Sequence, residues 1–150
     1  KELVCKHVYE RYGENAAMFL DDKLIETLNV IREQILCAPM TVNNWHAGGN
    51  FTQRGLRCNI CELVKSKTDA GRLYLSAHML GKAVDCNVEG MTAEEARRLI
   101  IAKQELLPYP IRLEDSVSWL HFDLYKNGKN EKMSLTNAGS FCIITPAMDS

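Results

Sequence analysis

The chain lacks three features that would each assign it to a familiar class of protein. None of its apolar runs approaches the roughly 20 residues of a membrane-spanning helix. Neither charge is in clear excess, because 18 basic and 19 acidic residues give a net charge of -1. The sequence also contains no repeat and no low-complexity segment. We therefore expect neither a membrane span nor a nucleic-acid partner.

The overall composition is that of a folded domain. The chain has 150 residues, of which 46% are hydrophobic and 25% charged, so it can bury a sizeable core. We expect a single domain over residues 1–150 that acts as a monomer. No signal peptide is visible, and the chain begins at Lys1 without Met, so the sequence leaves the localisation open.

The six cysteines are scattered, at positions 5, 37, 58, 61, 86 and 142. They do not have the spacing of a small disulfide framework, so most are expected to be buried thiols. Cys58 and Cys61 form one C-x-x-C pair. A structural zinc site needs two further ligands, and no second pair supplies them. The role of this pair, in metal binding, redox chemistry or a disulfide, stays open.

Hydrophobic periodicity predicts two helices. Apolar residues recur at steps of three and four over residues 21–36, which predicts a helix with an aspartate at its N-cap. A second helix is predicted to start at Thr92, which has capping-box spacing with Glu95, and to run to about Leu107. Prolines follow both segments and would end them.

The remaining segments predict strands and loops. Residues 40–43 are typical of a short strand, whereas 44–69 form a loop-rich stretch with many glycine and asparagine residues. Residues 83–88 and 119–125 both alternate apolar and polar side chains, as half-buried strands do.

This alternation predicts a metal site. It places Asp85 and His121 on the polar faces of two strands whose other faces are apolar. If the strands are neighbours, both side chains project into one cleft, and Gly81 permits a turn that brings His78 to the same point. Two histidines and one carboxylate leave a position open for water, as catalytic zinc requires. We predict that His78, Asp85 and His121 bind Zn²⁺.

The three ligands lie within a longer pattern, Ser-x-His-x-x-Gly-x-Ala-x-Asp over residues 76–85 and Trp-x-His-x-Asp over 119–123. In these residues the sequence resembles the zinc D-Ala-D-Ala carboxypeptidases and the related L-alanyl-D-glutamate endopeptidases, which include phage endolysins and share the hedgehog fold. The resemblance implies an α+β domain with a central antiparallel sheet flanked by helices. It also implies a zinc-activated water that hydrolyses a peptide bond in the stem peptides of bacterial peptidoglycan.

The resemblance implies roles for residues around the metal. Ser76 would be a polar residue close to the site, and Trp119 would form a wall of the cleft. A carboxylate must carry a proton from the water to the departing amine, and in relatives it stands shortly before the last histidine ligand. The closest such position is Ser118, which cannot act as a base. Glu114 and Asp115 are the remaining candidates, and we favour Glu114.

The developing oxyanion needs a cation or a hydrogen-bond donor. Arg54 and Arg57, in the loop-rich segment, are candidates for this role if that segment folds back toward the metal. His46 is a further candidate donor that would bind substrate. Asp123 lies two residues after His121 on the same face of the strand, which suits a carboxylate that orients a ligand histidine.

Two functions remain open from the sequence. The first is a zinc peptidase, either a carboxypeptidase or an endolysin-type endopeptidase, acting on the cell wall in the periplasm or after phage lysis. The second is a catalytically inactive domain of the same fold that holds zinc and binds a partner. The two share the metal and differ in the catalytic base. Which peptidoglycan bond is cut depends on the shape of the cleft, which the sequence does not reveal.

Overall fold

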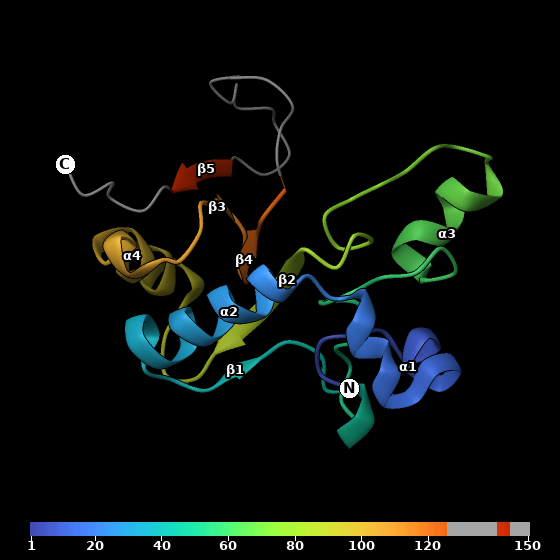
Figure 1. Cartoon of the computed structure of the whole chain (residues 1–150), viewed down its shortest axis with the longest axis horizontal. Coiled ribbons are helices and arrows are strands. Elements are labelled where there is room, and N and C mark those ends of the chain that lie inside the picture. The colour runs from blue at the N-terminus through green and yellow to red at the C-terminus, as the bar shows by residue number, and fades with distance from the viewer. Residues whose placement is uncertain (126–140, 145–150) are drawn as a thin grey trace.

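The computed structural model describes residues 1–125 and 141–144 of the chain (Figure 1). Within these residues five strands form one sheet in the order β1-β2-β4-β3-β5, and every neighbouring pair is antiparallel. The strands are β1 (Met40–Thr41), β2 (Ala83–Val88), β3 (Ile111–Glu114), β4 (Leu120–Asp123) and β5 (Phe141–Ile144). The expected α+β fold with a central antiparallel sheet is therefore confirmed.

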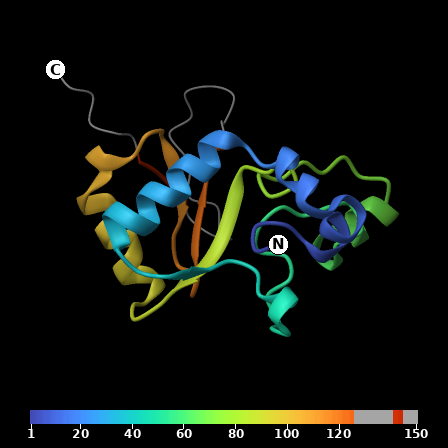
Figure 2. The same cartoon turned by 60° about the horizontal axis from the view of Figure 1, so that its bottom comes forward.

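The helices gather at the two ends of the molecule. Figures 1 and 2 show α2 and α4 beside the sheet, whereas α1 and α3 lie together at the opposite end of the molecule. Within the described residues, no helix combines the length and the apolar character needed to cross a membrane. The helical elements are α1 (Lys6–Tyr12), η1 (Gly13–Phe19), α2 (Asp22–Val30), η2 (Ile31–Leu36), η3 (Trp45–Ala47), α3 (Glu62–Asp69), α4 (Ala93–Ala102) and η4 (Gln104–Leu106).

The hydrophobic core lies between the sheet and the pair α2 and α4. Val84, Cys86 and Phe122 belong to this core and are completely buried. Burial of a side chain such as Phe122 stabilises the fold by roughly 1.5–3 kcal/mol. Because side chains alternate along β2 and β4, the residues between these apolar positions face away from the core. The opposite face of the sheet is thereby left for polar side chains.

Both predicted helices are present, with one correction. The first follows Asp21, whose carboxylate accepts a hydrogen bond from the Lys23 N–H at 2.9 Å, and continues as a π-helical segment to Leu36. The second starts with the predicted capping box. It ends at Ala102 rather than near Leu107, because Lys103 leaves helical geometry and a 3₁₀ turn follows.

The segment 44–69 differs from the prediction of a loop-rich stretch. It contains the helix α3, in which Val64 is the only fully buried side chain. One buried position in eight residues gives too little periodicity for a helix to be predicted from the sequence. The strand predictions are confirmed in place: β2 has the predicted bounds 83–88, whereas 119–125 contributes only β4 and 40–43 only β1.

Candidate metal centre

The pairing of β2 with β4 places two of the predicted ligands side by side. Asp85 lies directly opposite His121 in the antiparallel register. The Nδ1 atom of His121 is 2.6 Å from Oδ1 of Asp85, and both residues are buried. The neighbours Val84 and Phe122 point into the core on the other face. The strand alternation seen in the sequence therefore brings these two side chains together.

His78 reaches the same point from a tight turn before β2. Met79 and Leu80 donate their N–H groups to the Ser76 carbonyl, and Gly81 has a positive φ of 65°. A Cβ atom at position 81 would lie 2.0 Å from the Phe19 carbonyl oxygen, so only glycine fits. The turn leaves Nε2 of His78 at 3.3 Å from Oδ2 of Asp85.

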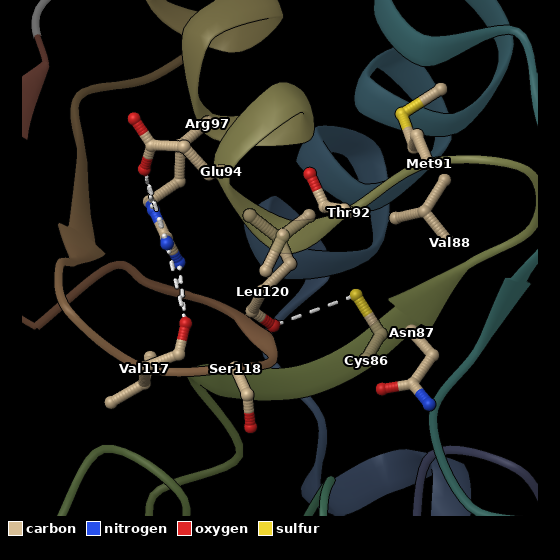
Figure 3. Close-up of a pocket in the computed structure, with 11 residues that line it drawn as sticks. Cys86, Asn87, Val88, Met91, Thr92, Glu94, Arg97, Val117, Ser118 and Leu120 are labelled. Atoms are coloured by element: carbon tan, nitrogen blue, oxygen red, sulfur yellow. Dashed lines mark hydrogen bonds and ion pairs between the residues drawn. The ribbon is translucent and has the colours of Figure 1, made fainter.

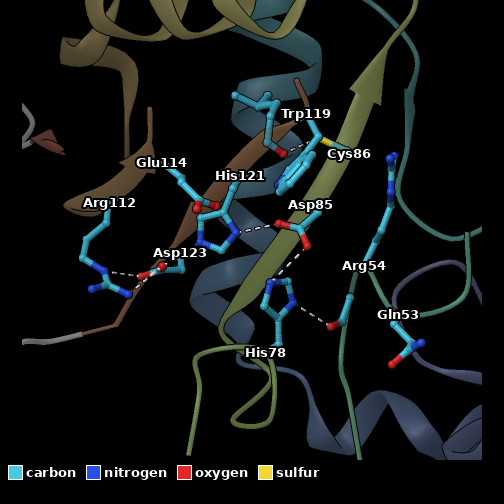
Figure 4. Close-up of polar contacts among 12 residues, drawn as sticks. Gln53, Arg54, His78, Asp85, Cys86, Arg112, Glu114, Trp119, His121 and Asp123 are labelled. Atoms are coloured by element: carbon cyan, nitrogen blue, oxygen red, sulfur yellow. Dashed lines mark hydrogen bonds and ion pairs between the residues drawn. The ribbon is translucent and has the colours of Figure 1, made fainter. Parts of the chain in front are cut away.

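The three side chains could hold a metal ion, because their ligand atoms all lie within 4.8 Å of one another. Each histidine also has its second ring nitrogen held by an oxygen. Nδ1 of His78 is 2.9 Å from the Gly55 carbonyl, and Nε2 of His121 is 2.8 Å from Oδ2 of Asp123. Outer contacts of this kind fix the tautomer and the ring orientation of histidine ligands. One nitrogen of each ring is thus left facing the Asp85 carboxylate (Figure 4).

Asp123 is itself held by a residue that the sequence did not identify. Arg112 binds it with two hydrogen bonds of 2.8 Å, from Nε and Nη2. Arg112 is paired with Asp123 across β3 and β4. Arg112 could have been identified only from the register of β3, and the sequence analysis did not predict this strand. Arg112, Asp123 and His121 therefore form one row of hydrogen-bonded side chains.

Burial and neighbouring charges shift the pKa values of Asp85, Asp123 and His121. Burial alone would raise the pKa of Asp85, but the hydrogen bonds with His121 and His78 hold it well below its usual range. Burial likewise opposes the ionised form of Asp123, yet the contacts with His121 and Arg112 lower its pKa. Burial alone would lower the pKa of His121, but its hydrogen bonds to Asp123 and Asp85 raise it to about 9. The site thus holds two carboxylates in their ionised form, each stabilised by cationic partners.

Of the two predicted arginines, the structure brings only the Arg57 guanidinium to the ligands. Its Nη2 donates to Oδ2 of Asp85 at 2.8 Å, while its Nε donates to the Gln53 carbonyl. The Arg54 guanidinium instead donates to Asn87 at 2.9 Å and lies over the Phe51 ring. Arg54 contributes through its backbone, since its carbonyl accepts the Asp85 N–H at 2.7 Å.

The structure also separates the two candidate bases. Figure 4 shows the Glu114 carboxylate beside His121. Burial raises the pKa of Glu114 above its ordinary value, and the charges of His121 and Asp85 act on it. Asp115 has a side chain that is 56% exposed, with Oδ1 3.9 Å from Nε of Arg97. Only Glu114 therefore faces the three candidate ligands.

The loop that carries Glu114 and Trp119 is fixed by a second residue that the sequence missed. Arg97, on α4, is buried and donates to the carbonyls of Glu114, Val117 and Trp119 at 3.2–3.4 Å. The sequence offered one indication of this role, because Arg97 interrupts an otherwise apolar face of α4. Arg97 also lines a pocket of about 430 Å³, with Ser118 and Cys86 on its walls (Figure 3). Because Cys86 alternates with Asp85 along β2, this pocket lies on the face away from the candidate ligands.

The three predicted substrate-binding residues have different environments. Trp119 lies beside Asp85 in Figure 4, and its Nε1 is buried with no hydrogen-bond partner among the described residues. Ser76 accepts the Met79 N–H within the turn that carries His78. His46 is exposed, and its ring packs edge-on against Trp45 in the wall of a separate pocket near the N-terminus. The structure therefore does not bring His46 to the metal centre.

Comparisons of the chain with protein-family models, with curated proteins and with solved structures find no match. The site must therefore be interpreted from its own residues and geometry.

Proposed function

We propose that this chain is a zinc metallopeptidase that hydrolyses a peptide bond in the stem peptides of bacterial peptidoglycan. The observation that carries the proposal is the arrangement of His78, Asp85 and His121, with both outer histidine nitrogens held by oxygens and with Glu114 beside them. Two histidines and one carboxylate leave a coordination position free for water or substrate, as catalytic zinc sites do. The sequence pattern around these residues supports the class of substrate.

The residues around the ligands fit the chemistry of peptide hydrolysis. When bound, Zn²⁺ lowers the pKa of a coordinated water to about 7 and polarises a carbonyl group. In this proposal Glu114 accepts a proton from the attacking water and delivers it to the departing amine. The raised pKa of its carboxyl group suits this role, because a general base works best when its pKa lies near the working pH.

The Arg57 guanidinium is the donor that would support the developing negative charge on the carbonyl oxygen. The Arg57 guanidinium is 14% exposed and lies against Asp85, so it is held in place close to the reaction site. Donors held in a water-poor site stabilise a transition state more than they would in water.

The test is incubation of the zinc-loaded protein with purified muropeptides, followed by mass spectrometry of the products. Release of free D-Ala identifies a carboxypeptidase, and a cut nearer the base of the stem identifies an endopeptidase. Glu114→Gln should lower the rate by about 10²–10⁴-fold and leave the zinc content unchanged, because it removes only the proton carrier. Asp115→Asn is the matched control and should keep the rate within about threefold, since that side chain points toward Arg97.

The competing function is an inactive zinc-containing module that binds a partner. If the wild-type protein holds zinc at His78, Asp85 and His121 and yet cleaves no muropeptide, the peptidase proposal is wrong and the binding module takes its place. Equal activity of Glu114→Gln and wild type would reject Glu114 as the base.

A further inference from the structure

A second cluster of metal-ligating side chains lies in the N-terminal half of the molecule. Cys5, His7, Cys58 and Cys61 place four ligand atoms within 4.8 Å of one another. Cys5 and His7 lie at the start of α1, and the C-x-x-C pair lies just before α3. The pair Cys58 and Cys61 thus has the two additional ligands that the sequence did not supply. They come from a segment about 50 residues away, and they are a cysteine and a histidine rather than a second C-x-x-C pair.

The separations among His7, Cys58 and Cys61 match those of a tetrahedral zinc site, and the Cys5 thiol lies within 4.8 Å of all three. Zinc binds sulfur at about 2.3 Å and nitrogen at about 2.0–2.1 Å, so a tetrahedron separates two sulfurs by about 3.8 Å and sulfur from nitrogen by about 3.5–3.6 Å. The Sγ atoms of Cys58 and Cys61 are 3.7 Å apart. Nδ1 of His7 lies 3.6 Å from Sγ of Cys58 and 3.8 Å from Sγ of Cys61.

The backbone holds the ligands in this arrangement. The Cys58 N–H donates to Sγ of Cys61 at 3.4 Å, and the Cys61 N–H donates to the Cys58 carbonyl at 3.2 Å, which closes a tight turn. The Cys5 N–H donates to the Leu56 carbonyl at 2.9 Å, and Val4 and Leu56 form a parallel bridge. Cys5 and Cys61 are buried, whereas His7 is exposed. The cluster is therefore built on fixed backbone and has one ligand at the surface.

We propose that Cys5, His7, Cys58 and Cys61 bind a second zinc ion that has a structural role. Four protein ligands fill a tetrahedral site and leave no position for a substrate, which is typical of structural zinc and differs from the His78, Asp85 and His121 site. The three thiols lose their protons on binding, and no electron transfer is involved.

The position of the proposed ion gives it a specific structural role. It joins the N-terminal segment to the loop that carries Gly55 and Arg57. The Gly55 carbonyl holds His78 at 2.9 Å, and the Arg57 guanidinium holds Asp85 at 2.8 Å. Arg57 also donates its N–H to the His78 carbonyl at 3.1 Å. The second ion therefore fixes the loop that orients two ligands of the first site.

The experiment measures metal binding without relying on enzymatic activity. The full-length double variant His78→Ala/His121→Ala keeps the Cys/His cluster and loses the first site. Elemental analysis of this variant should give one zinc per chain. Replacement of that zinc by Co²⁺ should produce thiolate-to-cobalt charge-transfer absorption in the near ultraviolet, which histidine and carboxylate ligands do not produce. This result would stand even if the peptidase proposal failed.

Substitutions of the exposed ligand test the geometry in the same background. His7→Ala should weaken zinc binding at least tenfold in competition with a chelator. His7→Cys should restore it, because the ligand number returns to four. Cys37→Ser is the control and should change nothing, since Cys37 is exposed and its thiol donates to the Glu33 carbonyl.

Two outcomes would overturn the proposal. The first is a folded double variant, purified under reducing conditions with zinc present, that contains no zinc and shows no thiolate band with Co²⁺. The second is a disulfide between Cys58 and Cys61 in protein isolated without oxidant, detected as a mass two hydrogens lower than that of the reduced chain and located by peptide mapping.

Discussion

The two candidate metal sites of this chain are constructed in different ways. His78, Asp85 and His121 are held by the sheet, because the register of β2 and β4 sets Asp85 opposite His121. The Cys/His cluster is held by loops and helix starts, and its ligands come from the two ends of a stretch of about 55 residues. The first site has three candidate ligands in a polar environment, whereas the second has four, of which Cys5 and Cys61 pack with the apolar Val64.

This contrast indicates separate roles for the two sites. A site with three ligands and a nearby carboxylate can activate water, whereas a closed site with three thiolates can only stabilise structure. The two sites are nevertheless connected, because the loop from Gly55 to Cys58 contacts both of them. Loss of the first site should therefore abolish activity and leave the second site intact, whereas loss of the second site should lower stability and also disturb the loop that orients the first.

The largest expected effect comes from the ligand that the sheet supplies. His121→Ala should lower muropeptide hydrolysis by at least about 10⁴-fold, because the metal and its activated water are lost together. The thiolate-to-cobalt absorption should remain. Cys61→Ser should show the converse stability effect, with a clear fall in the thermal unfolding midpoint, because it removes a buried ligand of the structural ion.

Activity assays and thermal unfolding of both variants check this separation. If His121→Ala abolished the thiolate absorption as well, the two sites would not be independent. A Cys61→Ser protein with an unchanged unfolding midpoint would reject the structural role of the second ion.

The same contrast explains what the sequence could predict. Strand alternation is a local property, so the faces of β2 and β4 and the position of Asp123 could be inferred from a few neighbouring residues. Arg112 and Arg97 were missed, because their roles depend on the register of β3 and on the packing of α4 against a loop. His46 was expected near the metal, but its ring packs on Trp45 instead.

The Cys/His cluster shows the limit more clearly. Ligands about 50 residues apart meet only because Val4 and Leu56 form a bridge, and nothing local in the sequence predicts that contact. Among the other cysteines, Cys86 is buried as expected, but Cys37 is exposed. The side chain of Cys142 lies outside the described part of the chain.

The next effect concerns pH and the metal-free protein. The pKa of His121 in the folded state, about 9, exceeds its ordinary value of 6.5. The imidazolium therefore contributes stability that is fully present below pH 6.5 and is lost as the pH rises through 9. A shift of this size corresponds to about 3 kcal/mol of unfolding free energy. The carboxylates Asp85 and Asp123, whose pKa values are lowered, have the opposite dependence and lose their contribution only in acid.

Denaturant unfolding of chelator-treated wild type and His121→Asn between pH 6 and 10 measures this effect. The difference between the two proteins should shrink as the pH rises, and the zinc-loaded wild type should not show the loss, because the metal replaces the proton. A difference that is independent of pH would show that the imidazolium makes no contribution.

The smallest expected effect tests whether the polar residues around the first site contribute to metal affinity in addition to its three candidate ligands. Asp123→Asn keeps the shape of a side chain that is 1% exposed, but it removes the charge that holds Nε2 of His121 and pairs with Arg112. Loss of such an outer carboxylate typically costs 10–100-fold in metal affinity. Chelator competition should show a fall of this size for the first site, with the affinity of the Cys/His cluster unchanged. The cluster is the internal control here, because its contacts are to thiols and backbone on another part of the chain.

If both affinities fell together, the substitution would have disturbed the fold rather than the orientation of His121. If neither affinity fell, the row from Arg112 to His121 would have no part in holding the metal.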